Sequence, residues 1–345
     1  MRNLTIKLSI LDQSPIGEGE NAEQGLKNTV KLAQAADSLG YNRFWVSEHH
    51  NNDQLAGSAP ESLIGFLLAS TKNIRIGSGG VMLQHYSPFK VAEVFHVLSA
   101  LAPDRVDLGV GKAPGGLSLS TKALQEDKRE EQKSFEEKLA DLHSYINEEE
   151  NVLELKAAPA PKVKPDIFLL GGSAESAELA GKLGISFVFA YFINGEENIL
   201  KEARARFKQF SPNGGGEFLL ALTVAVADSD EQADSYIKQR ESVKVIFADG
   251  RKLNVGSLEQ AEKVISQAGE SEYQLLVQKA GYVAGSKENV RKELTLLAEK
   301  YEIDEIISLS PIVNIEDRIY SYKLLTEAFA EDSKLKQKNN QGVGI

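Results

Sequence analysis

Eight short runs rich in β-forming residues, separated by helical patterns, constrain the fold of this chain more than any other feature. The runs lie at residues 4–11, 42–46, 73–80, 105–111, 166–172, 185–191, 217–228 and 303–311. Several are apolar at successive positions, as in "FWV", "IFLL" and "FVFA", which is typical of a parallel sheet covered on both faces. The alternation of strand and helix therefore predicts an α/β fold built on a parallel sheet.

Helices are predicted between most of these runs. Residues 88–101 place Val91, Phe95 and Leu98 at the spacing of a helix that packs against a sheet. Further helices are predicted at 23–39, 60–72, 286–300 and about 316–331, and the charged segment 119–149 predicts one solvated helix. A closed (β/α)8 barrel (a TIM barrel) and an open doubly wound sheet both accommodate this order. The eight strands and the length of 345 residues favour the barrel.

The segment 228–285 is too long for a single connection and contains at least two helical patterns. It predicts an insertion between strand seven and its helix. Insertions above the mouth of a barrel often form lids over a binding site. We expect one domain over residues 1–331, with this insertion as a lid, followed by a polar tail at 332–345.

Composition excludes several classes of function. A net charge of −11 disfavours binding to nucleic acid or to an anionic membrane surface. No apolar run approaches the ~20 residues that span a bilayer. The chain has no cysteine and no HExxH pattern, so neither a disulfide nor a metal site is predicted. These observations predict a cytoplasmic protein.

Polar or glycine-rich residues follow five consecutive strands. The carboxyl ends of barrel strands meet at one edge, where the active sites of such barrels are built. We therefore expect a ligand-binding mouth at this edge. Because adjacent histidines on extended backbone point in different directions, at most one of the pair is expected to face the ligand. The polar or glycine-rich residues that follow the five strands are Glu48-His49-His50, Gly79-Gly80, Lys112, Gly171-Gly172-Ser173 and Tyr191.

An anion site is predicted at residues 169–179, "LLGGSAESAEL". A strand ends there in two glycines, and a helix begins at Ser173. Free N–H groups and the positive end of the helix dipole would meet an anion. Neither "GSGG" (77–80) nor "GVGKAPGG" (109–116) completes a dinucleotide-binding or P-loop fingerprint, so no nicotinamide site is predicted.

Four stretches carry a resemblance to a known family. They are "LSILDQSPIGEG", "LGYNRFWVSEHH", residues 58–116 and "YVAGSKENVRKELTLLAEKY". The chain resembles the bacterial luciferase-like flavin monooxygenases, and within them the luciferase family oxidoreductases of group 1. The match is dense over residues 8–116 and thin over 195–280.

The resemblance implies a (β/α)8 barrel that holds reduced flavin, usually FMN, across the carboxyl ends of its strands. Glu48 and His49 match a Glu-His pair beside the reacting edge of the flavin, and His50 is a second choice for catalysis. Gly79-Gly80 match a non-prolyl cis peptide under the isoalloxazine ring. The FMN phosphate matches Gly172, Ser173 and Ala174, with Lys112 where relatives more often have arginine, and Tyr191 borders the ring.

The implied reaction is oxygenation of a small organic substrate through a flavin hydroperoxide, which must be shielded from water. His49 would move a proton, and Glu48 would orient it or contact the flavin. Reduced FMN would come from a separate flavin reductase, and family members are often homodimers. Two alternatives remain open: a deazaflavin-dependent dehydrogenase or reductase, and a flavin-binding protein without activity.

Overall fold

The computed structural model describes residues 6–126, 133–149, 155–211, 214–238, 241–248, 250, 252–269 and 271–340, the last ten of these as helix backbone only. Eight parallel strands close into a barrel, and β12 returns to pair with β1. The prediction of a (β/α)8 barrel is confirmed. The strands are β1 (Lys7–Asp12), β2 (Arg43–Val46), β3 (Arg75–Met82), β4 (Val106–Gly111), β5 (Asp166–Gly171), β6 (Ser186–Ala190), β7 (Phe218–Val226) and β12 (Glu305–Leu309).

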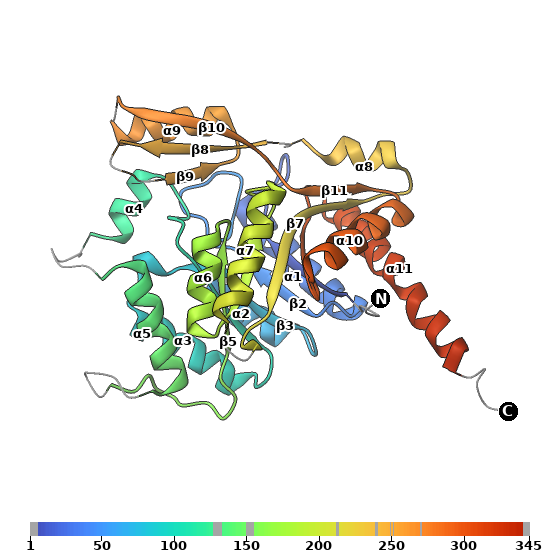
Figure 1. Cartoon of the computed structure of the whole chain (residues 1–345), viewed down its shortest axis with the longest axis horizontal. Coiled ribbons are helices and arrows are strands. Elements are labelled where there is room, and N and C mark those ends of the chain that lie inside the picture. The colour runs from blue at the N-terminus through green and yellow to red at the C-terminus, as the bar shows by residue number, and fades with distance from the viewer. Residues whose placement is uncertain are drawn as a thin grey trace.

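Helices surround the barrel (Figure 1), and the sequence sets their ends. Asn21 caps the start of α1 by accepting a hydrogen bond from the N–H of Gln24, and Gly40 ends this helix in the left-handed region. Ser87 and Pro88 begin α3 in the same manner. The surrounding helices are α1 (Ala22–Leu39), α2 (Pro60–Ser70), α3 (Pro88–Leu101), α5 (Phe135–Asn147), α6 (Ala174–Leu183), α7 (Glu197–Phe210), α10 (Lys287–Tyr301) and α11 (Ile315–Asn340).

Alternating strand residues divide the buried side chains into two layers. One layer fills the space between the strands and the helices, with Phe44, Phe187 and Phe189 among its largest side chains. The second layer fills the barrel interior around Trp45 and Phe168, whose rings meet edge to face at 4.8 Å. The interior is therefore a packed core that supports whatever binds above it.

The charged segment 119–149 is not one solvated helix. The short helix α4 (Ser118–Leu124) and the helix α5 are separate, and residues 127–132 lie outside the described part of the chain. Phe135, Leu139 and Leu142 are buried on α5, at helical spacing that the surrounding charges obscure. At the other end of the chain, α11 continues beyond residue 331, the end expected from sequence, to Asn340.

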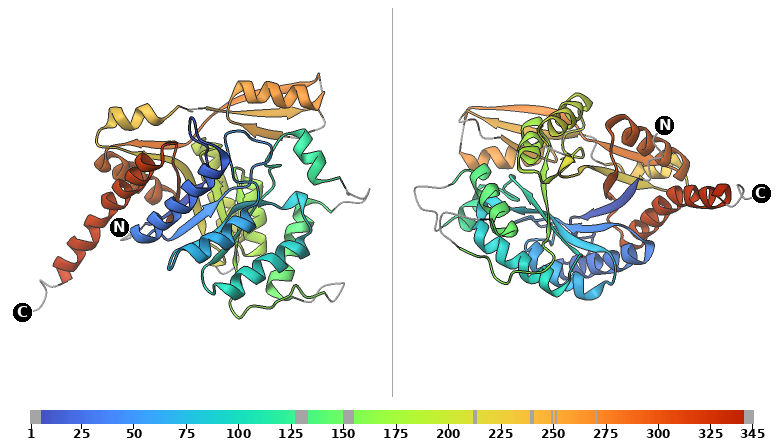
Figure 2. Two further views of the ribbon diagram at one scale, coloured as in Figure 1. Left: turned by 180° about the vertical axis from the view of Figure 1, so that it is seen from behind. Right: turned by 60° about the horizontal axis from the view of Figure 1, so that its bottom comes forward.

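The insertion after β7 forms its own small sheet. Three antiparallel strands lie in the order β10-β8-β9, and α9 packs on one face. Figures 1 and 2 show this unit beyond the barrel strands, beside α4. The elements are α8 (Asp230–Tyr236), β8 (Glu241–Phe247), β9 (Lys252–Val255), α9 (Leu258–Ala268), β10 (Tyr273–Lys279) and β11 (Tyr282–Gly285), which pairs with β7.

Among the described residues, no helix combines the length and the apolar character that crossing a membrane requires.

Candidate active site

Glu48 lies just past the end of β2 and is fully buried. Its carboxylate accepts three hydrogen bonds, from the N–H of Met82 at 3.0 Å, the hydroxyl of Tyr86 at 2.7 Å and Nε2 of His50 at 2.7 Å. Burial, and then the hydrogen bond to Glu48, raises the pKa of Tyr86 well above its ordinary value. The carboxylate therefore ties the end of β2 to the segment that follows β3. No hydrogen bond joins it to His49 among the described residues, so it does not orient that imidazole directly.

His49 points away from Glu48. Its main-chain N–H donates to the carbonyl of Gly57 at 2.8 Å, and its ring Nε2 lies 3.4 Å from the side-chain amide nitrogen of Gln13. Burial, and then the nearby His50, lowers the pKa of His49 to about 4. The imidazole is therefore neutral at neutral pH, and a ring nitrogen can accept a proton. As the sequence predicted, the two adjacent histidines take different partners.

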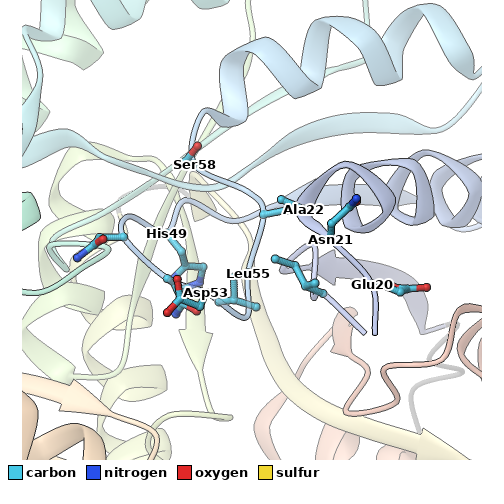
Figure 3. A pocket seen from close by; sticks show the side chains of 11 residues that line it. Glu20, Asn21, Ala22, His49, Asp53, Leu55 and Ser58 are labelled. Atoms are coloured by element: carbon cyan, nitrogen blue, oxygen red, sulfur yellow. The ribbon is translucent and has the colours of Figure 1, made fainter. Parts of the chain in front are cut away.

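His49 also forms part of the wall of a pocket of about 490 Å³. Figure 3 shows His49 and Asp53 on one side of this pocket, with Glu20 and Asn21 across from them. The pocket lies between the segment that follows β1 and the segment that follows β2. Its lining is mixed in polarity and consists of Ile16, Glu20, Asn21, Ala22, His49, Asn51, Asn52, Asp53, Leu55, Ala56 and Ser58.

A third imidazole, that of His85, supports this edge of the barrel. It lies in the 3-10 helix η1 (Leu83–His85) that follows β3, and its Nε2 lies 2.8 Å from the carbonyl of Pro114. The amide nitrogen of Gln125 lies 2.8 Å from Nδ1 of the same ring. His50 meets the ring edge to face at 6.3 Å. Sequence reasoning missed His85, although "QHYSP" closely follows the glycines that mark the third strand.

Gly79 and Gly80 lie on β3 where its register with β4 shifts, and the peptide bond between them is cis, as the resemblance implied. Neither position has room for a side chain. A Cβ on Gly79 would lie 2.5 Å from a methyl group of Leu11, and one on Gly80 would lie 2.8 Å from the carbonyl oxygen of Gly109. The strand therefore presents bare backbone at this point.

The predicted anion site has the expected helix start. Ser173 caps α6 and accepts a hydrogen bond from the N–H of Ser176 at 3.3 Å. Ala174 is the first, buried residue of the helix. The side-chain amide of Asn194, in the β6–α7 connection, donates to the carbonyl of Gly172 at 3.0 Å and fixes the turn before the helix. Asn194 gave no signal in the sequence, because it is distant from this turn along the chain.

Lys112 and Tyr191 occupy different surroundings. The ammonium of Lys112 lies 2.9 Å from the carboxylate of Glu136, and 65% of its side chain is exposed. Tyr191 packs in the layer between barrel and helices, where burial, and then the charge of Glu197, raises its pKa to about 12. Its neighbour Phe192, which sequence reasoning missed, packs against the interior layer.

Comparison with known proteins places this chain in a family. The model of the luciferase-like monooxygenases matches residues 6–300. The chain is 56% identical over 328 residues to the N-acetyl-S-alkylcysteine monooxygenase of Bacillus subtilis (strain 168). This alignment covers 94% of this chain and 98% of that protein. It also matches the crystal structure of apo-MsnO8 with a TM-score of 0.77 and 35% identity, over 94% of this chain and 98% of that one.

A more distant structure shares the fold. The oxygenating constituent of 3,6-diketocamphane monooxygenase from Pseudomonas putida, solved in complex with FMN, matches with a TM-score of 0.68 and 18% identity, over 94% of this chain and 98% of that one. The present chain belongs to the luciferase-like monooxygenase family. It is a monooxygenase of that family.

Proposed function

We propose that this enzyme uses reduced FMN and dioxygen to oxygenate a small organic substrate. The observation that carries the proposal is the position of His49, a neutral imidazole in the wall of a pocket at the carboxyl edge of the barrel. Bound flavin would supply the oxygen chemistry, through the hydroperoxide that the family resemblance implies. The chain itself would bind and orient the reactants and move a proton at His49.

The residues at this edge fit a flavin. Gly79 and Gly80 present backbone without side chains, so a flat ring can approach this strand closely. The start of α6 at Ser173 and Ala174 offers first-turn N–H groups to a phosphate, with Gly172 in the turn before them. In the proposal, Lys112 contributes positive charge near the same end of the cofactor and Tyr191 borders the ring.

Glu48 takes a positioning role in this proposal. Its carboxylate is already shared among Met82, Tyr86 and His50, so it holds the segments that carry His49 and His50 rather than reaching the reacting atoms. His49 remains the proposed catalytic residue. Because its pKa is about 4, it enters the reaction as an acceptor of a proton, and an anionic partner would raise its pKa.

We propose a thioether as the substrate class, because the relative with 56% identity is an N-acetyl-S-alkylcysteine monooxygenase. Three asparagines, Asn21, Asn51 and Asn52, line the pocket beside His49. Side-chain amides of this kind can hydrogen-bond both an acetamide and a carboxylate.

The test supplies purified enzyme with FMN, a flavin reductase and its reduced nicotinamide cosubstrate, labelled dioxygen and N-acetyl-S-methylcysteine. We expect one labelled oxygen atom in the product, and a rate lower by about 10²-fold in His49→Gln. His143→Gln is the matched control, since His143 lies on α5. Absence of labelled product with FMN, together with turnover of a deazaflavin without oxygen uptake, would refute the proposal.

We further propose a cytoplasmic homodimer served by a separate reductase. Phe66 on α2 is 61% exposed, and Val97 and Leu101 on α3 are 44% and 79% exposed. Apolar side chains gathered on two neighbouring helices favour contact with a second copy. Leu101→Lys should shift the sedimenting species from dimer to monomer, whereas an unchanged species would refute this interface.

A further inference from the structure

The small sheet of the insertion has two chemically different faces. Val243, Val245 and Phe247 of β8 point to one face, where they form a core with α9. Because side chains alternate along a strand, Ser242 and Lys244 point to the other face. The strand β10 continues this second face with Leu276 and Gln278, which pair with Lys244 and Ser242.

This second face lies toward the connections that form the predicted anion site. The hydroxyl of Ser242 donates to the carbonyl of Ile193 at 2.6 Å. The next residue, Asn194, donates to the carbonyl of Gly172 just before α6. Two hydrogen bonds therefore link the insertion, through the β6–α7 connection, to the turn that precedes the start of α6.

Gln278 is buried on this face, with 8% of its surface exposed, and its side-chain oxygen Oε1 has no hydrogen-bond partner among the described residues. A buried amide oxygen without a partner is costly, so it calls for a donor from outside the chain. Leu276, on the same face, is 49% exposed. The described side chains therefore do not fill this face.

Lys244 is half-buried and lies close enough to Glu175, in the first turn of α6, for their charges to interact. Burial, and then repulsion by Lys252, lowers the pKa of Lys244, and Glu175 only partly offsets both. Glu175 itself carries negative charge at the helix start, where its own backbone N–H and the hydroxyl of Ser173, and then the charges of Arg206 and Lys252, lower its pKa. The cations at this point can therefore serve a second anion as well as Glu175.

We infer that the insertion completes the cofactor site: the ammonium of Lys244 binds the phosphate of FMN at the start of α6, and Oε1 of Gln278 accepts a hydrogen bond from the adjacent ribityl chain. This inference rests on the proposed function, since it assigns residues to the same cofactor. Lysine suits the role because its ammonium binds phosphate as a point charge. Because Lys244 binds the phosphate in this assignment, Lys112 can keep its ion pair with Glu136 when FMN binds.

The experiment measures equilibrium binding of FMN, riboflavin and lumiflavin, all in reduced form and without oxygen, to the full-length chain by the change in protein fluorescence. Riboflavin lacks the phosphate, and lumiflavin lacks the ribityl chain as well. We expect Lys244→Met to weaken FMN by about tenfold or more, the loss of one charge-assisted contact, and to leave riboflavin within about twofold. Gln278→Leu should weaken FMN and riboflavin by the same factor and leave lumiflavin unchanged.

Lys263→Met is the matched control, because Lys263 lies on α9 of the same insertion and pairs with Glu259 at 2.9 Å. It should change no affinity. The inference is overturned if Lys244→Met keeps the preference for FMN over riboflavin, or if that preference disappears in Lys112→Met alone. It is also overturned if Lys244→Met leaves FMN affinity intact and raises only the KM for N-acetyl-S-methylcysteine, because Lys244 would then bind the carboxylate of the substrate. A wild-type chain that binds none of the three flavins refutes the proposed function itself.

Discussion

The two ends of the barrel treat their polar groups in opposite ways. At the amino end, the guanidinium of Arg43 bonds two buried carboxylates, Asp107 at 3.0 Å and Glu305 at 2.9 Å. Asp107 also accepts the indole N–H of Trp45 at 2.9 Å. At the carboxyl end, the one polar contact of the His49 ring among the described residues is with Gln13 at 3.4 Å, beside an open pocket.

The difference shows where this fold places stability and where it leaves room for chemistry. At the amino end the buried charged groups pair with one another, although Oε2 of Glu305 lacks a partner among the described residues, and a charged pocket of about 810 Å³ lies beside Arg204 and Glu217. At the carboxyl end the chain leaves an imidazole and the amide oxygen of Gln278 without strong partners. Buried polar groups without strong partners lower the free energy of unfolding, and a ligand that forms hydrogen bonds with them would offset this loss.

The largest effect is expected where the amino end is broken. Arg43→Met removes the cation that Asp107 and Glu305 share. Asp107 keeps Arg75 as a partner, whereas Glu305 is left buried with no cationic partner among the described residues. We expect the free energy of unfolding to fall by roughly 3–5 kcal/mol, as when one partner of a buried ion pair is removed. Urea unfolding measures the loss.

Lys7→Met is the control for Arg43→Met. Lys7 pairs with Glu217 at 3.5 Å on the surface of the same end, with both side chains about half exposed. An exposed pair of this kind contributes less than about 1 kcal/mol. If the two variants lose equal stability, the buried ion pairs of Arg43 contribute no more to the fold than an exposed pair does. FMN affinity should be unchanged in both.

A smaller effect is expected from Glu48→Gln at the carboxyl end. The amide keeps the shape of the carboxylate but offers one acceptor oxygen to three donors, the groups of Met82, Tyr86 and His50. We expect a loss of about 1–3 kcal/mol in the free energy of unfolding. If Glu48 has the positioning role that we propose, KM should rise more than kcat falls, and Glu48→Asp should restore part of both.

Unchanged stability in Glu48→Gln would show that the three hydrogen bonds contribute little. A fall in kcat alone, with KM intact, would instead move Glu48 into contact with the reacting atoms.

The barrel could be predicted from the sequence because its signals are local. Each strand is a short apolar run, and helices such as α3 show their buried stripe directly. α5 could not be recognised as buried, because Phe135 and Leu139 stand among charged residues that face solvent. The pairing of β11 with β7 was equally hidden, since it depends on where the insertion returns to the sheet.

The candidate site was predictable where one short stretch carries it. The strand ends placed Glu48, His49 and Gly79 at the same edge. Partners from distant parts of the chain were not predictable, as the bond from Asn194 to Gly172 shows. Side-chain direction was also beyond the sequence: Tyr191 follows β6 as expected, yet its ring packs on the outer side of the barrel.

The smallest effect concerns the pH dependence that His49 gives to stability. The pKa of His49 is about 4 in the folded chain, below the ordinary 6.5 of an unfolded chain. Between these values the unfolded chain holds one more proton than the folded chain, so the free energy of unfolding rises with pH. The slope is at most about 1.4 kcal/mol per pH unit, and partial exposure of the ring reduces it. Stability from this source is complete above pH 6.5 and is lost as pH falls toward 4.

Urea unfolding at a series of pH values should show a shallower slope of stability against pH in His49→Gln than in wild type or His143→Gln. Equal slopes in all three would mean that the imidazole is as well solvated in the folded chain as in the unfolded chain.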